Sequence, residues 1–121
     1  MNNNQVRQNE AKELEKSISH IIVEIIEYVP NAVVSKTIIK KSTGNITAMS
    51  FAEGEELGLK TIPFDTFIQI IDGSAEVTIN KRIHNLPLGT GIIIPAHSTH
   101  CFNANEQFKM ISTVIKSGYE D

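Results

Sequence analysis

The sequence predicts an all-β protein, one closed barrel or jelly roll preceded by a short N-terminal helical segment. Isoleucine is the commonest apolar residue in a chain that is 40% hydrophobic, and β-branched side chains pack well on pleated strands. Short apolar stretches also recur at regular spacing between turn-forming residues, which is typical of sheets that close on themselves. The length of 121 residues fits one domain, which we place at residues 13–121.

The N-terminal part is the least regular. Residues 1–12 are polar, and we expect them to be disordered. Between Leu14 and Val29, apolar residues recur at helical spacing, which predicts a helix. The run Ile21-Ile22-Val23 fits equally well a short strand that leads into a helical turn at residues 24–28. Pro30 ends either structure.

After Pro30 the pattern changes to strands separated by turns. Asp72-Gly73-Ser74 is a tight-hairpin signal, and Pro87-Leu88-Gly89 marks another turn. There is no internal repeat and no linker, so the strands belong to one domain. They are predicted, in order, at 33–40, 46–52, 67–71, 75–79, 82–86, 92–94, 100–104 and 108–115.

Charge and composition exclude several classes of partner. The formal net charge is -3 and the basic residues are scattered, whereas nucleic-acid binding needs a basic face. No apolar run is long enough to cross a membrane, and the first residues lack the apolar core of a signal peptide. The single cysteine, Cys101, cannot form an internal disulfide. We therefore expect a soluble cytoplasmic protein without nucleic-acid or membrane partners.

Two stretches resemble the two motifs of the cupin superfamily. The first runs from Gly54 to Gly73 and contains Pro63-Phe64-Asp65, a step shared with small stand-alone cupins that mostly lack an established activity. The second runs from Gly89 to Ala104, with the glycine-to-proline spacing and the following histidine in register. The resemblance extends from about Val33 to Ile115. It implies a double-stranded β-helix, the cupin jelly roll, and pairing into a homodimer.

The resemblance also locates a metal site that has lost its usual ligands. In cupins the first motif supplies two histidines and a glutamate, and the second motif supplies one histidine. The two histidine positions fall on Lys60 and Ile62, the glutamate position falls on Thr66, and only the last ligand is kept, as His100. Isoleucine cannot coordinate a metal, a protonated lysine repels one, and a neutral hydroxyl replaces a carboxylate poorly. No cofactor is expected; a divalent transition metal held by His100 and His97 is the alternative.

If the family register holds, strand alternation turns these same positions into the barrel. The candidate ligand-binding residues are then Lys60, Thr66, His100 and Phe102, in a cavity that is otherwise mostly apolar. Such a lining suits a small organic molecule with one or two polar groups. No catalytic residue is predicted.

Two of these residues have competing interpretations. Lys60 can hold a carboxylate or act as an amine of lowered pKa, or it can extend to water from the barrel mouth. His100 can be a general base, a ligand contact or a residual metal ligand, or it can hydrogen-bond Thr66 or a water. The neighbouring Cys101 points to the opposite face of the strand, which argues against a thiol–imidazole pair.

Three functions remain open. The first, favoured by the loss of three of the four metal-ligand positions, is a metal-free cupin that binds a small polar or anionic molecule in its barrel. The second is a metal-dependent oxygenase or isomerase with atypical ligands. The third is a non-catalytic structural or regulatory dimer whose barrel is filled by its own side chains.

Overall fold

The computed structural model describes residues 6–10 and 12–118. These residues form ten strands and one 3-10 helix, which confirms the predicted all-β class. The elements are β1 (Val6–Glu10), η1 (Ile22–Glu24), β2 (Val33–Lys41), β3 (Gly44–Phe51), β4 (Glu56–Thr61), β5 (Asp65–Gly73), β6 (Ala75–Ile79), β7 (Arg82–Leu86), β8 (Gly91–Ile94), β9 (Thr99–Asn103) and β10 (Phe108–Ile115).

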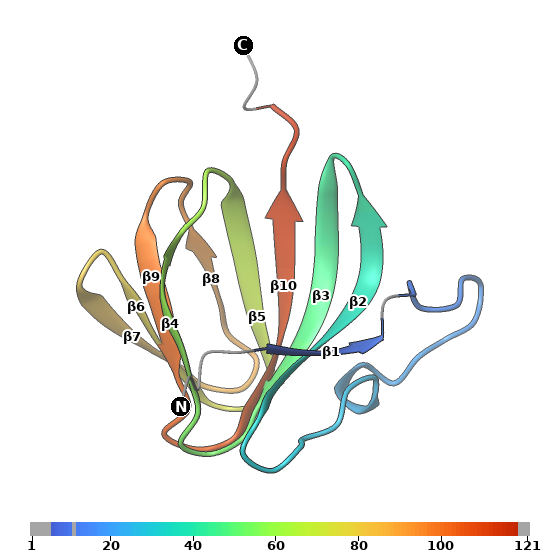
Figure 1. The fold of residues 1–121 in the computed structure, drawn as a ribbon, viewed down its shortest axis with the longest axis horizontal. Helices are drawn as coiled ribbons and strands as arrows, with labels where there is room; N and C mark the ends of the chain where they lie inside the picture. The colour runs from blue at the N-terminus through green and yellow to red at the C-terminus, as the bar shows by residue number, and fades with distance from the viewer. Residues whose placement is uncertain (1–5, 11, 119–121) are drawn as a thin grey trace.

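The strands form two sheets, shown in Figure 1. The six-stranded sheet has the order β1-β2-β3-β10-β5-β8, and the four-stranded sheet has the order β4-β9-β6-β7. All pairs are antiparallel except β1 with β2. Strands far apart in sequence are therefore neighbours, as the jelly-roll prediction requires. Within the described residues, no helix is long and apolar enough to cross a membrane.

The helix predicted between Leu14 and Val29 is wrong. The structure has only the three-residue η1 there, and Ser17 has a φ of 68°, which interrupts any helix. The segment is rich in isoleucine, whose β-branched side chain disfavours helical backbone. Its apolar residues instead divide into two sets, since Ile25 and Ile26 are buried while Ile21 remains 65% exposed.

Part of the stretch 1–12 that we expected to be disordered forms β1. This strand pairs in parallel with β2 and provides a partner for the backbone groups at that edge. Val6 lies opposite Val33 and packs against the barrel core. Figure 1 shows β1 crossing in front of β3 and β10. Residues 1–5 and 11 lie outside the described residues.

The hairpin predicted at Asp72-Gly73-Ser74 is also wrong. β5 ends at Gly73 in the six-stranded sheet, and β6 begins at Ala75 in the four-stranded sheet. The chain does turn sharply here, since Gly73 has a φ of 68°. The turn takes the chain from one sheet to the other, as at the corners of packed sheets.

Two apolar cores stabilise the fold. The larger core lies between the sheets, and its aromatic centre is Phe51, stacked on Phe108 at 4.4 Å between ring centroids. Phe102 adds a tilted contact with Phe51 at 5.9 Å. The smaller core lies on the outer face of the six-stranded sheet, where Ile25 and Ile26 cover neighbours on β2, β3 and β10. The segment before β2 thus forms a partial second layer over that sheet.

A buried lysine helps to fix this segment to the sheet. Lys109 on β10 is 8% exposed, and its Nζ donates a hydrogen bond to the Val23 carbonyl oxygen at 2.7 Å. The same Nζ lies 4.9 Å from the centroid of the Tyr28 ring, a cation–π contact. The Tyr28 hydroxyl donates to Asp72 Oδ2 at 2.6 Å. Burial, together with this carboxylate, raises the pKa of Tyr28.

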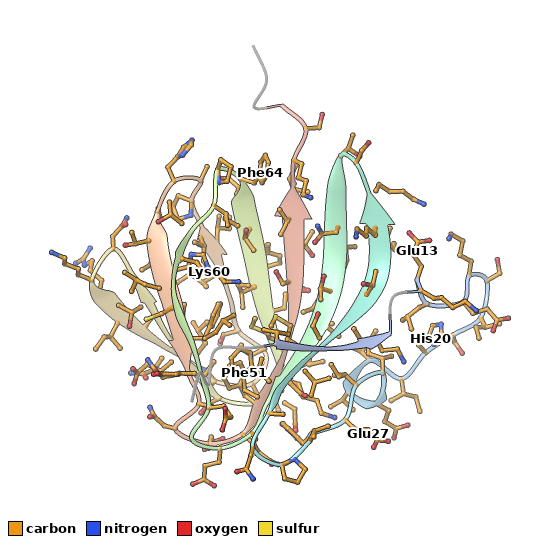
Figure 2. The ribbon with its side chains drawn as sticks, in the orientation of Figure 1. Glu13, His20, Glu27, Phe51, Lys60 and Phe64 are labelled. Atoms are coloured by element: carbon orange, nitrogen blue, oxygen red, sulfur yellow. The ribbon has the colours of Figure 1, made fainter. Side chains whose placement is uncertain are left out.

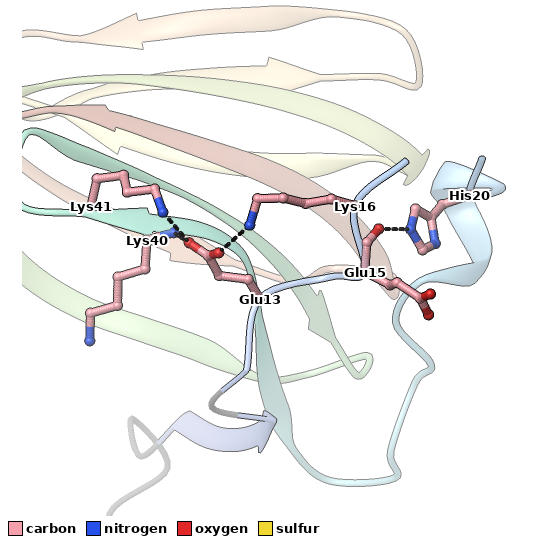
Figure 3. Close-up of polar contacts among 6 residues, drawn as sticks. All are labelled: Glu13, Glu15, Lys16, His20, Lys40 and Lys41. Atoms are coloured by element: carbon pink, nitrogen blue, oxygen red, sulfur yellow. Dashed lines mark hydrogen bonds and ion pairs between the residues drawn. The ribbon is translucent and has the colours of Figure 1, made fainter. Parts of the chain in front are cut away.

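A second anchor, drawn in Figure 3, centres on Glu13. Its Oε1 accepts a hydrogen bond from Lys16 Nζ at 2.8 Å, and its Oε2 accepts one from the Lys40 backbone N–H at 2.7 Å. Lys41 Nζ forms an ion pair with Oε2 at 3.3 Å. These contacts, the Lys16 hydrogen bond first, lower the pKa of Glu13 from 4.5 to about 2.

The Glu13 contacts give a stability difference that depends on pH. Because the folded-state pKa is about 2, against an ordinary value of 4.5, the stabilisation is present above pH 4.5 and is lost as the pH falls toward 2. Glu13→Gln is therefore expected to be less stable than the wild type at pH 7 and equal to it near pH 2. The effect is small because the lysine partners, Lys16 and Lys41, are exposed to solvent. Urea unfolding at a series of pH values measures it, and a difference that grows toward low pH would contradict the assignment.

Candidate functional site

A cavity of about 300 Å³ lies inside the barrel. Apolar side chains supply most of its wall, and the polar exceptions include Lys60, Thr66 and His100. Among the lining residues that the structure describes, Lys60 and His100 are the ionisable ones, both are basic, and no lining residue carries a carboxylate. The lining residues are Val6, Ser35, Met49, Leu57, Lys60, Ile62, Thr66, Ile68, Ile94, His100, Phe102, Met110, Ser112 and Val114.

A β-bulge in β4 turns Lys60 toward this cavity. Leu57 pairs with Phe102 on β9, but three residues later Lys60 pairs with His100, so β4 holds one extra residue between these pairs. A bulge of this kind lets two residues of one strand oppose one residue of its partner. Both Leu57 and Lys60 therefore line the cavity, Leu57 as a buried residue and Lys60 as one that is also exposed to solvent, while Leu59 is 72% exposed. Figure 2 shows Lys60 on β4.

The turn before β9 is held by side chains from two other parts of the barrel. The Asp65 Oδ1 atom accepts a hydrogen bond from the Ala96 backbone N–H at 2.8 Å. The Asn80 Oδ1 atom accepts one from the Thr99 backbone N–H at 3.1 Å, and its amide donates to the Ser98 hydroxyl at 3.3 Å. These bonds fix the start of β9 and thereby position His100.

The His100 ring is buried against an aromatic neighbour. Its side chain is 7% exposed, and it meets Phe102 in an edge-to-face contact with 5.8 Å between ring centroids. Burial lowers the pKa of His100, and the charge on Lys60 lowers it further, while the Ser98 backbone acts in the opposite direction. The neutral imidazole is therefore favoured, with one ring nitrogen as a donor and the other as an acceptor.

Two buried polar atoms in the cavity lack hydrogen-bond partners. They are Thr66 Oγ1 and His100 Nδ1. The hydrogen bond that we considered between Thr66 and His100 is therefore not formed. An unpaired buried donor or acceptor costs about 1–3 kcal/mol, and most such atoms in folded proteins are paired. Both atoms belong to residues that line the cavity.

The residues at the cupin metal positions do not fit a metal. Lys60, Ile62, Thr66 and His100 all line the same cavity, but His100 alone has a ligating side chain of the usual kind. Within the described part of the chain, no three His, Cys, Asp or Glu side chains are grouped as a metal site needs. His97, the other candidate ligand, is exposed in the turn before β9, with a φ of 68°, and does not line the cavity.

Sequence reasoning located part of the cavity wall and missed the rest. The four predicted ligand-binding residues line it together, although their role in binding stays a prediction. The lining residues on β1, β2, β3 and β10 were missed, namely Val6, Ser35, Met49, Met110, Ser112 and Val114. Alternation along the strand that contains Val33 and Ser35 was the available signal for part of this wall. Cys101 is only partly buried and lies between two inward-facing residues of β9, so its side chain points away from the cavity.

Comparisons with known proteins agree with this architecture. A conserved protein of unknown function from Streptococcus pyogenes has 27% identity and a TM-score of 0.82, over 87% of this chain and 92% of that one. A cupin superfamily protein from Desulfitobacterium hafniense has 26% identity and a TM-score of 0.80, over 86% and 95%. A cupin 2 conserved barrel domain protein from Leptotrichia buccalis has 29% identity and a TM-score of 0.76, over 78% of this chain and 46% of that one. No protein-family model and no curated protein matches the chain.

Proposed function

We propose that this chain, which belongs to the cupin superfamily, binds a small polar or anionic molecule in its barrel without using a metal ion. The observation that carries the proposal is the charge of the cavity wall. One permanent cation, Lys60, and the neutral ring of His100 face a cavity in which no described lining residue is acidic, although the chain as a whole carries a net charge of -3. A positive cavity in an acidic protein favours a negative or strongly polar occupant.

The size of the cavity argues against a barrel filled by its own side chains. Small-molecule sites in proteins begin at about 300 Å³, and this cavity reaches that size. The bulky inward residues Ile68 and Phe102 narrow the barrel without closing it. The third function considered from the sequence, a filled structural barrel, is therefore the less favoured one.

The metal-dependent alternative requires ligands that the cavity does not bring together. It depends on His97 and His100 converging, and only His100 lines the cavity. Lys60 is the register partner of His100 on β4, so its positive charge lies close to the position that a divalent cation would occupy. Such a charge opposes metal binding.

The test is the composition of the purified protein. The protein is purified without added metal, and its metal content is measured. It is then titrated with nickel, zinc and iron. A separate sample is denatured, and any small molecule that is released is identified. Substoichiometric metal and a released polar or anionic compound are expected. Tight, stoichiometric metal binding that is lost in His100→Ala would overturn the proposal.

We also propose that the protein forms a homodimer through the outer face of the six-stranded sheet. The register aligns one row, apolar except for Thr113, across five strands, in the order Ile93, Phe67, Thr113, Ile46 and Ile39. Ile93 is 62% exposed and Phe67 is 42% exposed, whereas Ile46 packs against the cluster that contains Ile25 and Ile26. A two-fold axis would let the row pack against its own copy. No nucleic-acid or membrane partner is proposed, and a cytoplasmic location stays the expectation.

Phe67→Glu is expected to convert the dimer into a monomer of unchanged fold. The substitution places a carboxylate within the exposed part of the row, so like charges from the two copies would meet at the interface. Sedimentation velocity measures the change in mass, and circular dichroism checks the fold. Leu88→Glu is the matched control, because Leu88 is 62% exposed in the turn after β7. A wild-type chain that is monomeric at high concentration would contradict the dimer.

A further inference from the structure

We infer that the molecule bound in the barrel is a monocarboxylic acid with a short apolar tail. The carboxylate would lie against Lys60, Thr66 and His100, and the tail would extend toward Phe51. This inference rests on the proposed function and narrows it to one chemical class of ligand.

The polar groups of the cavity match a carboxylate. The Thr66 hydroxyl can donate one hydrogen bond, the neutral His100 ring can donate another from Nδ1 when that nitrogen carries the proton, and the Lys60 ammonium can donate more. A carboxylate accepts at two oxygens with about four lone-pair directions. It would satisfy both buried atoms that lack partners, Thr66 Oγ1 and His100 Nδ1. Its bond to the ammonium would be charge-assisted and therefore stronger than a neutral one.

The charge of the cavity matches a single negative charge. Lys60 is the one permanent cation on the described wall, and burial favours the neutral form of His100. A phosphate would bring close to two charges at neutral pH and three strong acceptor oxygens. One ammonium and two neutral donors would leave part of the negative charge of such a group uncompensated. A monoanion is the better match.

On its β4, β9 and β5 side the cavity is polar at one end and apolar at the other, while Ser35 on β2 and Ser112 on β10 add hydroxyl groups elsewhere on the wall. Three strands step from a polar to an apolar inward residue in the same direction: from Lys60 to Leu57 on β4, from His100 to Phe102 on β9, and from Thr66 to Ile68 on β5. This direction leads to the aromatic contacts of Phe51, which lies lower than Lys60 in Figure 2. A bound molecule would meet water and charge at its head and dispersion contacts at its tail.

The volume limits the length of the tail. Water occupies about 30 Å³ per molecule in the liquid, so a cavity of about 300 Å³ holds about ten water-sized groups. An acid of roughly six to eight carbons fills this space. Each buried methylene adds about fourfold to the affinity, up to the length at which the cavity is full.

The experiment is an NMR titration of the full chain with defined probes. Butanoate, hexanoate and octanoate form the length series, hexanamide is the neutral isostere of hexanoate, and inorganic phosphate is the anion without a tail. We expect hexanoate to shift the methyl and amide signals of cavity residues. Its affinity should be about tenfold or more higher than that of hexanamide. Compared with butanoate, its affinity should rise about fourfold for each added methylene.

Two variants test the role of the charge. Lys60→Met keeps the length of the side chain and removes the ammonium, and it should weaken hexanoate about tenfold or more while leaving hexanamide unchanged. Lys40→Met is the matched control, because Lys40 is an exposed lysine on β2 that does not line the cavity. It should leave both affinities unchanged.

Each outcome separates the inference from the proposed function. Equal affinity for hexanoate and hexanamide, or tighter binding of phosphate, would overturn the carboxylic-acid inference and leave a polar-ligand barrel standing. Failure of every probe, together with no compound extracted from the purified protein, would overturn both. If a tightly held compound blocks the titration, the compound is extracted and identified. A carboxylic acid with an apolar tail supports the inference, and any other compound overturns it.

Discussion

Phe51→Ala is expected to destabilise the fold by about 3–5 kcal/mol, the usual cost of truncating a buried phenylalanine. Phe51 is fully buried, stacks on Phe108 and contacts Phe102, so alanine leaves a cavity between the two remaining rings. Domains of this kind have a total stability of about 5–15 kcal/mol. The variant should therefore unfold at a much lower urea concentration, as followed by circular dichroism.

Leu59→Ala serves as the control for Phe51→Ala. Leu59 is 72% exposed on β4, and substitutions at such positions change stability by about 0.5 kcal/mol or less. If Phe51→Ala cost no more than this control, the aromatic cluster would not be the centre of the core. Because Phe102 also touches His100, the same loss of packing should change the methyl and ring signals of the cavity in variants that remain folded.

Gly73→Ala is expected to cost at least about 2 kcal/mol, through two effects at one position. The φ of 68° is unfavourable for any residue with a side chain, by roughly 1–2 kcal/mol. A Cβ atom would also lie 2.1 Å from the Gln107 carbonyl oxygen, and relieving such a clash typically adds about 1–3 kcal/mol. The backbone where the chain changes sheets would have to move. Urea unfolding measures the loss.

Gly54→Ala separates the two effects. Gly54 has a φ of 88°, and a Cβ there would meet nothing within 4 Å. This variant should therefore lose only the conformational part, roughly 1–2 kcal/mol. Equal losses in the two variants would show that the contact with Gln107 relaxes without cost.

The strands of the barrel follow from the sequence because their signals are local. Ala75–Ile79, Arg82–Leu86 and Phe108–Ile115 are found with the predicted bounds, since each is a stretch of β-formers between turn residues. The spacing around Pro95 and His100 also located one wall of the cavity. These features depend on neighbours within a few residues.

What could not be predicted depends on contacts between distant parts of the chain. The turn at Gly73 was visible, but nothing local says that β6 joins the other sheet. The isoleucines near Ile25 have the spacing of a helix, yet a sheet face that accepts them in another conformation overrides the pattern. β4 was not predicted as a strand, because its alternation is broken between Leu57 and Lys60.

That break in β4 places the charge of the cavity under the control of strand register. If β4 alternated regularly from Leu57 with no bulge, Leu59 rather than Lys60 would be the second inward residue. The wall would then offer no permanent charge to a ligand, with no change in the side chains themselves. In this barrel, ligand preference depends on a bulge in an edge strand, a feature that comparison of residue types alone does not detect.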